Sequence, residues 1–322
     1  MRRRTDENAL VRRIEDKFAS RKRDLLGWPL ADDAACWSPA PGHQTLLTCD
    51  WFLEGSHFLR HQHPPEAVGW KCLARAVSDI AAMGGEPRCF LLSLALPPAL
   101  TGNWLAAFLN GLRRASLALD CELAGGDTTR NEKVLISISV IGEVKAHGAV
   151  RRSGARPGDA IYVSGILGEA ELGLEELRRQ RGPARAGNVA LRKHLYPQPR
   201  LALGRWLAEK QLVGAMMDLS DGLSTDLGRL CAASGMGARI EAASLPCTPL
   251  VEAQAARKLA LHGGDDYELL FTVAPRKAAQ LPPRFRGVAL TRIGEITRDK
   301  KILVDTGKGI RELRPGGWDP FR

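Results

Sequence analysis

The 322-residue sequence lacks the features that would cross-link the chain or anchor it in a bilayer. None of its seven cysteines belongs to a CxxC pair and their number is odd, which argues against a disulfide framework and a structural zinc site. No apolar run is long enough to span a membrane. The basic residues 1–7 have no apolar stretch behind them, so we predict no secretory signal. We therefore expect a cytoplasmic protein without a membrane partner.

Signatures of several common phosphate-binding and nucleic-acid-binding classes are also missing. The chain contains no GxxxxGK[ST] loop and neither the HRD nor the DFG element of protein kinases. Its formal net charge is +10, but Lys and Arg are spread along the chain and aromatic residues make up only 6%. No predicted helix carries a basic stripe interleaved with aromatic residues. A surface that attracts anionic small molecules explains the charge as well, so we expect no nucleic-acid partner and keep nucleic-acid binding as the less favoured alternative.

The sequence does contain alternating apolar strands and amphipathic helices in both halves. Its length favours two domains, and 44% hydrophobic residues can form sizeable cores. A turn at 155–159 separates the halves, and we place the domain boundary between residues 149 and 150. The alternation lacks strict βαβ regularity, which favours an α+β or mixed α/β fold over one parallel sheet.

Aspartates recur near the ends of the predicted strands, in short turns that contain glycine. A strand at 45–49 is expected to end before Asp50, and a brief strand at 121–124 precedes Gly125-Gly126-Asp127. One such Asp is usually a turn former or a helix N-cap. Repeated along one chain, such carboxylates favour sites for a hard cation such as Mg²⁺, which binds oxygen ligands and phosphates.

Two glycine-rich segments, 125–129 and 164–168, could each form a nest of backbone N–H groups around an anion. Either segment alone is a weak signal, because glycine-rich turns are common.

Seven short motifs resemble, in the same order, the motifs of the thiamine-monophosphate kinase family. They are DDAA (32–35), CDWFLEGSHF (49–58), SDIAAMG (78–84), GGDTT (125–129), RSGARPGD (152–159), DLSDGL (218–223) and GGDDYEL (263–269). Related ATP-binding families share the architecture and some carboxylates. They include aminoimidazole ribonucleotide synthetase, selenophosphate synthetase and the hydrogenase maturation dehydratase. The EGSHF and GGDDYEL elements fit the thiamine branch best.

The resemblance implies the two-domain fold of aminoimidazole ribonucleotide synthetase. Residues 1–149 would bind ATP and Mg²⁺ and form a homodimer, and residues 150–322 would complete the nucleotide and substrate site. The implied activity is ATP- and Mg²⁺-dependent phosphorylation of thiamine monophosphate to thiamine diphosphate, the last step of thiamine diphosphate biosynthesis. The alternative is another ATP-using synthetase of the superfamily, similar to aminoimidazole ribonucleotide synthetase or selenophosphate synthetase.

The resemblance also assigns roles to individual residues. The implied metal-binding residues are Asp33, Thr48, Cys49, Asp50, Asp79, Asp127, Asp218 and Asp221. The implied ATP-binding residues are Gly126, Asp127, Arg152 and Ser220, and the implied substrate-binding residues are His57, Asp265 and Trp318. At Cys49 the backbone would assist, since a thiol is too soft to be a preferred Mg²⁺ ligand. No catalytic nucleophile or base is expected, because in-line transfer to an ionised phosphate depends on positioning and charge neutralisation.

Three departures from the family pattern matter for the site. Trp28-Pro29-Leu30-Ala31 replaces the usual Gly-Ile-Gly before the paired Asp residues, which restricts that backbone. Cys49 replaces Thr. Asp265 replaces Glu and is one methylene shorter, so its contact with the substrate would need a water or a small shift of the loop.

Overall fold

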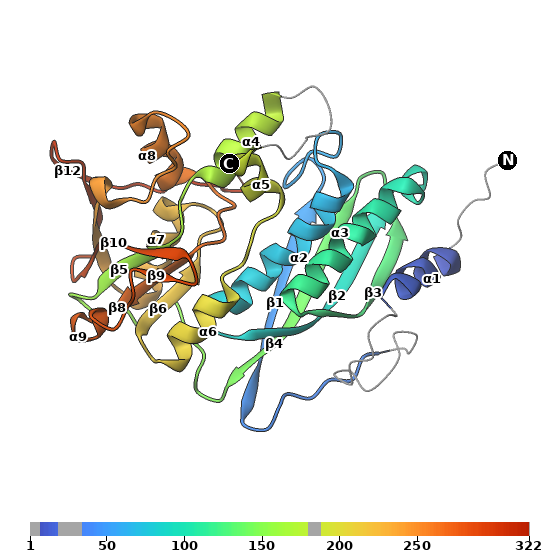
Figure 1. Ribbon diagram of the computed structural model, residues 1–322, viewed down its shortest axis with the longest axis horizontal. Helices are drawn as coiled ribbons and strands as arrows, with labels where there is room; N and C mark the ends of the chain where they lie inside the picture. The colour runs from blue at the N-terminus through green and yellow to red at the C-terminus, as the bar shows by residue number, and fades with distance from the viewer. Residues whose placement is uncertain (1–6, 19–33, 180–187, 322) are drawn as a thin grey trace. The chain divides into compact units, whose positions relative to one another are not determined.

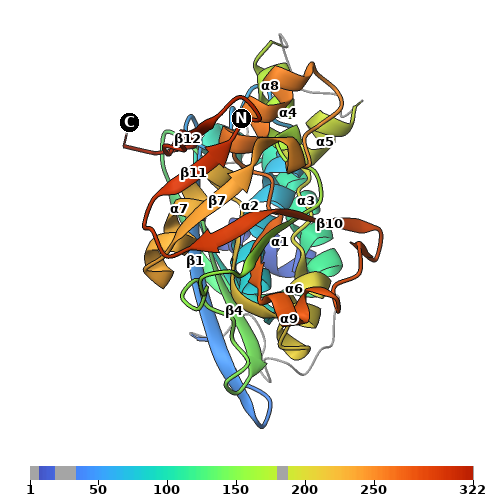
Figure 2. The same ribbon diagram turned by 90° about the vertical axis from the view of Figure 1, so that its left-hand side faces the viewer.

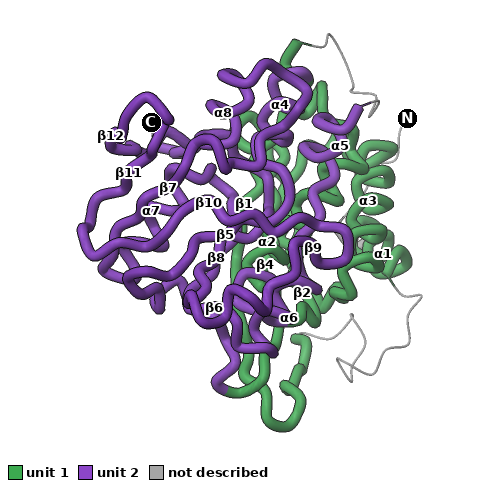
Figure 3. The backbone as a smooth tube through the Cα atoms, turned by 60° about the vertical axis from the view of Figure 1, so that its left-hand side comes forward, with its two compact units in different colours: residues 1–80, 86–146, 177–185 green, residues 81–85, 147–176, 186–322 purple. Residues whose placement is uncertain are grey.

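The structure, a computed structural model, describes residues 7–18, 34–179 and 188–321. The chain divides into two compact units (Figure 3). Unit 1 comprises residues 1–80, 86–146 and 177–185, and unit 2 comprises residues 81–85, 147–176 and 186–322. The domain boundary between 149 and 150 stays a prediction.

Unit 1 is built on a four-stranded sheet in the order β1-β4-β2-β3. The strands are β1 (His43–Leu53), β2 (Glu86–Leu96), β3 (Glu122–Arg130) and β4 (Leu135–Lys145). The pair β2–β3 is parallel, whereas β4 is antiparallel to both of its neighbours. The helices are α1 (Glu7–Phe18), α2 (Pro65–Ala82), α3 (Asn103–Leu119) and the short 3₁₀ helix η1 (Pro98–Leu100).

Strand β1 shows that the two faces of this sheet differ. Helices α2 and α3 lie along one face (Figure 1), and Phe52 on that face is buried beneath the Arg75 guanidinium of α2. Residues of a strand alternate between faces. Accordingly, Leu47 on the opposite face is 75% exposed and Trp51 is also exposed. The face remote from α2 and α3 therefore carries large apolar side chains in contact with solvent.

Helices α2 and α3 approach each other closely through one glycine on each. A Cβ added to Gly69 of α2 would lie 2.1 Å from the carbonyl oxygen of Phe108, and one added to Gly111 of α3 would lie 1.9 Å from that of Glu66. Real Cβ atoms do not come so near a carbonyl oxygen. The helix spacing in unit 1 therefore depends on the missing side chains at these two positions.

Unit 2 contains a sheet in the order β12-β11-β7-β10-β5-β8-β6, with β9 paired to β10. Its strands β12, β11, β7 and β10 are labelled in Figure 2. The strands are β5 (Ala160–Ser164), β6 (Val213–Asp218), β7 (Gly237–Glu241), β8 (Leu269–Val273), β9 (Arg284–Phe285), β10 (Val288–Thr297), β11 (Ile302–Asp305) and β12 (Ile310–Glu312). The helices are α4 (Glu169–Arg179), α5 (Val189–Leu195), α6 (Leu201–Glu209), α7 (Leu223–Ser234), α8 (Ala253–His262), α9 (Pro275–Ala278) and the 3₁₀ helix η2 (Ala242–Ser244).

The central strands of this sheet are buried on both faces. In β8, Leu270 packs into a cluster with Leu223 and Leu227 of α7, whereas Leu269 and Phe271 pack into a second cluster with residues of α6. Helices thus cover both faces, and β8 reads as a continuous apolar run for that reason. The predicted mixed α/β fold class is confirmed. Among the described residues, no helix is long and apolar enough to cross a bilayer.

The expectation that the aspartates occupy turns at strand ends was wrong for several of them. Strand β1 continues past Asp50 to Leu53, because Trp51 and Phe52 extend its alternation of exposed and buried residues. Asp79 lies within α2, and Asp127 lies within β3. Asp218, by contrast, is the last residue of its strand, β6.

Segment 125–129 is therefore strand rather than a turn. Gly125 and Gly126 have φ of 155° and 153°, a backbone region that favours glycine. A Cβ on Gly126 would lie 1.9 Å from the carbonyl oxygen of Leu92 in the neighbouring strand. Gly126 thus permits a close backbone approach between β3 and β2.

Replacing either interhelical glycine should destabilise unit 1. We expect Gly69→Ala and Gly111→Ala to cost about 1–3 kcal/mol, the usual range for overpacking, and to lower the thermal unfolding midpoint. The matched control is Gly228→Ala in α7, where the nearest atom to the new Cβ is 3.7 Å away. Alanine favours a helix by about 1 kcal/mol over glycine, so this control should be neutral or stabilising. Equal midpoints for all three variants would contradict the close-approach account.

Candidate functional site

The residues predicted to form the site divide between the two units. Unit 1 contains Thr48, Cys49, Asp50, His57, Asp79, Gly126 and Asp127. Unit 2 contains Arg152, Asp218, Ser220, Asp221, Asp265 and Trp318. Asp33, and with it the altered segment 28–31, lies outside the described residues.

In unit 1 the structure joins two of the predicted metal ligands directly. The Thr48 hydroxyl of β1 donates a hydrogen bond to the Asp79 carboxylate of α2, at 2.5 Å. Asp50 follows Thr48 on the same face of the strand, since it lies two residues further along. The thiol of Cys49 points to the opposite face, where its Sγ lies 3.4 Å from the Ser137 hydroxyl. Oxygen donors thus gather on the helix side of β1, and the soft sulfur does not.

Asp127 is separated from this oxygen cluster within unit 1. Asp127 pairs with Ser93 of β2, and Ser93 pairs with Ser137 of β4. All three residues lie on the sheet face remote from α2. Strand β3 is also the edge opposite β1, three strand spacings away or about 14 Å. Unit 1 of a single chain therefore does not bring Asp127 to Thr48 and Asp79.

His57 lies in the turn that follows β1. The Leu53 amide donates to His57 Nδ1 at 3.1 Å, and the imidazole lies 6.1 Å from the Phe52 ring. Because Nδ1 accepts this bond, the proton of the neutral ring is on Nε2. The turn thus fixes both the position and the tautomer of this predicted substrate contact.

In unit 2 the turn between β6 and α7 connects most of the predicted site residues. The Ser220 carbonyl accepts a hydrogen bond from the Asp265 amide at 2.8 Å. The Asp221 carbonyl accepts one from the Trp318 amide at 2.9 Å. Asp218, the last residue of β6, leads into the same turn. Three distant chain segments therefore meet at Ser220 and Asp221, which places metal-binding and substrate-binding candidates side by side.

A buried carboxylate that the sequence analysis missed holds this turn. Oδ2 of Asp226 accepts hydrogen bonds from the amides of Ser220 at 3.1 Å and Asp221 at 3.0 Å. Its other oxygen pairs with Arg229, which also pairs with Asp221. Burial, together with the nearby charge of Asp221, raises the pKa of Asp226 to about 6. The only signal in the sequence was an Asp in the first turn of the predicted helix, a position that usually indicates a favourable helix dipole contact.

The Asp265 carboxylate is positioned by side chains of its own motif and of α5. The Tyr267 hydroxyl donates to Asp265 Oδ1 at 2.6 Å, and Nδ1 of His194 lies 3.8 Å from Oδ2. Asp265 and Tyr267 both have positive φ, 65° and 50°, which is costly for a bulky residue such as tyrosine. This backbone brings the hydroxyl back onto the carboxylate two residues earlier.

Arg152 is not brought to Ser220, its predicted partner in ATP binding. The Ser234 hydroxyl donates to the Arg152 carbonyl at 3.0 Å, at the C-terminal end of α7. Ser220 precedes the N-terminal end of this 12-residue helix. The two backbones are therefore roughly 17 Å apart along α7.

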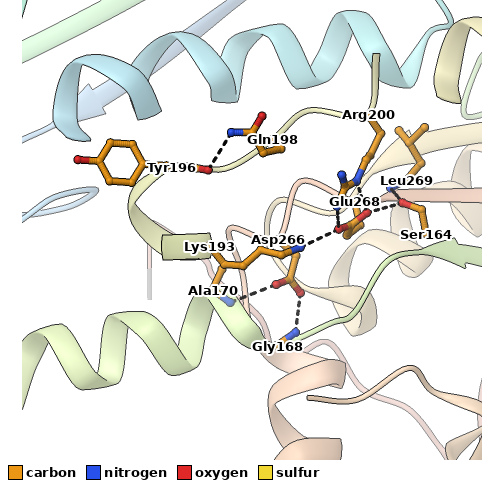
Figure 4. A network of polar contacts seen from close by, with 10 residues as sticks. All are labelled: Ser164, Gly168, Ala170, Lys193, Tyr196, Gln198, Arg200, Asp266, Glu268 and Leu269. Carbon is orange, nitrogen blue, oxygen red and sulfur yellow. Dashed lines mark hydrogen bonds and ion pairs between the residues drawn. The ribbon is translucent and has the colours of Figure 1, made fainter. Parts of the chain in front are cut away.

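Glu268 centres a second buried network that the sequence analysis did not find (Figure 4). Its carboxylate accepts hydrogen bonds from Nε and Nη2 of Arg200 and from the Ser164 hydroxyl, the last at 2.6 Å. Lys193 Nζ lies 3.1 Å from the same group. Burial alone would raise the pKa of Glu268, but Arg200, Lys193 and Ser164 together lower it. This network ties the 263–269 motif to the end of β5.

The Asp266 carboxylate binds at the glycine-rich loop 164–168, the segment predicted to form a possible anion nest. Its carboxylate accepts from the amides of Gly168 at 2.7 Å and Ala170 at 3.3 Å, at the start of α4 (Figure 4). These amides therefore bind a carboxylate of the chain itself. Full burial raises the pKa of Asp266 to about 7.

The oxygen donors present in the site fit Mg²⁺. Within the described ranges, no three His, Cys, Asp or Glu side chains gather into a group that could hold an ion by themselves. Mg²⁺ commonly takes one or two protein carboxylates and completes its shell with water and phosphate. Thr48 with Asp79 is a donor set of this kind, Asp218 and Asp221 supply further carboxylates three residues apart, and the Cys49 thiol points away.

Comparison with known proteins identifies the family. Residues 31–144 match the N-terminal domain of AIR synthase related proteins, and residues 156–306 match their C-terminal domain. The thiamine-monophosphate kinase of Escherichia coli strain K12 is 39% identical over 327 residues, which cover 98% of each chain. The chain belongs to the thiamine-monophosphate kinase family. The family resemblance inferred from the seven motifs is confirmed.

Solved structures of the thiamine-monophosphate kinase family share the fold. A crystal structure of the enzyme from Stenotrophomonas maltophilia K279a has a TM-score of 0.82 and 36% identity, covering 93% of this chain and 96% of that one. A structure of AaThiL complexed with AMPPCP and TMP has a TM-score of 0.76 and 33% identity, covering 97% and 96%.

The buried Asp266 should make stability depend on pH in an unusual direction. Its folded pKa of about 7 exceeds the ordinary 3.8, so the folded state holds a proton that the unfolded state releases. The stabilisation from this proton is present below about pH 4 and is lost as pH rises to about 7. We expect Asp266→Asn to lose less thermal stability than the wild type between pH 5 and pH 8, as measured by circular dichroism. The matched control is Asp305→Asn, at an exposed carboxyl whose pKa is lowered; it should not change the slope in this window. If the thermal stability of Asp266→Asn and of the wild type changed equally with pH between pH 5 and pH 8, the result would contradict a protonated Asp266.

Proposed function

We propose that this chain transfers the γ-phosphate of ATP to thiamine monophosphate, giving ADP and thiamine diphosphate. Identity of 39% over nearly the whole length to the Escherichia coli enzyme carries this proposal. The turn at Ser220 and Asp221 adds support, because its backbone hydrogen bonds bring together residues that the family resemblance makes candidates for metal and substrate binding. The product places the reaction last in the formation of thiamine diphosphate.

Mg²⁺ ions would be held by the oxygen donors of both units. These donors are Thr48, Asp50, Asp79 and Asp127 in unit 1, Asp218 and Asp221 in unit 2, Asp33, and the Cys49 backbone. When bound, Mg²⁺ neutralises phosphate charge as it develops on the transferring group. Gly126, Arg152 and Ser220 stay candidates for ATP contacts.

The chain's own residues would bind and orient the two substrates. A phosphate oxygen of thiamine monophosphate attacks the γ-phosphorus as the bond to the ADP oxygen breaks. That oxygen is already ionised, so the chain need supply no general base. Asp265, fixed by Tyr267, would contact thiamine monophosphate together with His57. Trp318, partly exposed beside the turn, offers an aromatic face to a substrate ring.

We further propose that two copies pair through the sheet face of unit 1 remote from α2. Leu47, Trp51 and Leu91 expose apolar surface on this face, which is the usual mark of an interaction site. Asp127 lies on the same face. Pairing would therefore place this carboxylate against the partner copy and away from its own Asp79.

The alternative function is that of another ATP-using synthetase of the superfamily. The matching domain families, named for AIR synthase, are the observation that favours it. ADP release tested with thiamine monophosphate and with formylglycinamidine ribonucleotide separates the two. Turnover with the ribonucleotide alone would overturn the kinase assignment.

Removing a metal-ligand carboxylate should abolish the reaction. We expect Asp79→Ala and Asp127→Ala each to reduce ADP release driven by thiamine monophosphate by about 100-fold or more, since phosphate charge is no longer neutralised. Asp305→Ala, at an exposed carboxylate paired with Arg239, is the control and should retain activity. Near-normal turnover in both site variants would rule out the metal-cluster account.

A charge on the exposed apolar face should prevent pairing. We expect Leu47→Asp and Trp51→Asp to convert a dimer into a monomer in sedimentation velocity experiments, because a buried unpaired carboxylate is costly. Leu250→Asp, which changes a half-exposed leucine in unit 2, should sediment as the wild type does. Dimeric site variants would exclude this face as the interface.

A further inference from the structure

Arg229 lies between the two carboxylates of the β6–α7 turn. Its Nη1 is 2.5 Å from Asp221 Oδ2 and 2.8 Å from Asp226 Oδ1. One guanidinium thus neutralises a predicted metal ligand and a buried carboxylate at the same time. Neither the motif resemblance nor the charge pattern pointed to it.

The three side chains differ in their freedom to move. Asp226 is fully buried and accepts two backbone amides, so it cannot leave without stranding a charge. Arg229 is 43% exposed on the second turn of α7, with a long side chain that solvent can accept. The ion pair with Asp221 is therefore the contact that can open.

A divalent cation and Arg229 would compete for the charge of the Asp221 carboxylate in this arrangement. Arg229 donates to Oδ2, the oxygen through which Asp221 meets α7. A metal on the same carboxylate would lie within a few ångströms of the guanidinium, and like charges at that distance repel strongly even at the protein surface. Loss of the Arg229–Asp221 contact would accompany metal binding.

We propose that Arg229 is an internal competitor for the metal at Asp221. In the absence of ligand it serves as the counter-ion of Asp221, and metal binding displaces it toward solvent while Asp226 keeps the turn in place. Arg229 thereby raises the metal concentration at which the site fills. This inference rests on the proposed role of Asp221 as a metal ligand.

Binding of Mn²⁺, a paramagnetic substitute for Mg²⁺, tests the competition without turnover. The free ion is measured by electron paramagnetic resonance during titration of the full chain. Exposed ion pairs contribute up to about 1 kcal/mol, so Arg229→Gln should lower the Mn²⁺ concentration for half-saturation by up to about fivefold. Arg229→Lys, which keeps the positive charge, should stay close to the wild type. The Mg²⁺ concentration for half-maximal ADP release should fall in parallel in Arg229→Gln.

The chain offers a closely matched control in Arg239. Its side chain is 45% exposed and pairs with Asp305 at 2.9 Å in the same unit. Arg239→Gln and Arg229→Gln each remove one positive charge. An equal gain in Mn²⁺ affinity in both variants would show that the effect comes from overall charge, and would overturn the competition.

Asp221→Asn separates failure of the inference from failure of the site. If Asp221→Asn binds less Mn²⁺ than the wild type while Arg229→Gln binds as the wild type does, the competition alone is wrong. If Asp221→Asn and the wild type bind Mn²⁺ equally, Asp221 is not a metal ligand, and both the proposed site role and the competition fail.

Discussion

Two backbone hydrogen bonds, from the amides of Ser220 and Asp221 to the buried carboxylate of Asp226, are the constraint on which the rest of unit 2's candidate site depends. The carbonyls of the same two residues accept from Asp265 and Trp318. Both the N–H groups and the carbonyl groups of this short turn therefore make hydrogen bonds. A change in the turn would move the proposed metal ligand Asp221 and the proposed substrate contacts Asp265 and Trp318 together, so their relative positions are set by one local structure.

The motif at 263–269 illustrates how one short segment serves structure and function at once. Asp265 is partly exposed, whereas its neighbour Asp266 and the nearby Glu268 are buried and bonded to loop amides and to cations. Removing one partner from a buried ion pair is far more damaging than removing an exposed pair. The role of an acidic residue in a motif therefore becomes clear only when its burial is known, because composition alone does not distinguish Asp265, Asp266 and Glu268.

Much of the fold was predictable from the sequence, because apolar periodicity determines which segments bury a face. It predicted the mixed α/β fold class, with helices and strands in both halves of the chain. It failed at Asp50 and Gly125-Gly126, where a strand continues through residues that usually interrupt one. The roles of Asp226, Arg229 and Glu268 were not predictable, since each depends on partners that only the folded chain brings together. The family resemblance named candidate site residues, which stay predictions, but not the groups that hold them in place.

The separation of donors within unit 1 bears on how such a site can bind metal. Asp127 and the Thr48–Asp79 pair lie on opposite faces and at opposite edges of one sheet. Mg²⁺ in proteins usually takes part of its coordination shell from water and phosphate, so ligand phosphates would complete the shells that these proposed oxygen donors begin. In unit 2 the proposed ligand Asp221 already pairs with Arg229, so a metal ion and the guanidinium would compete for one carboxylate.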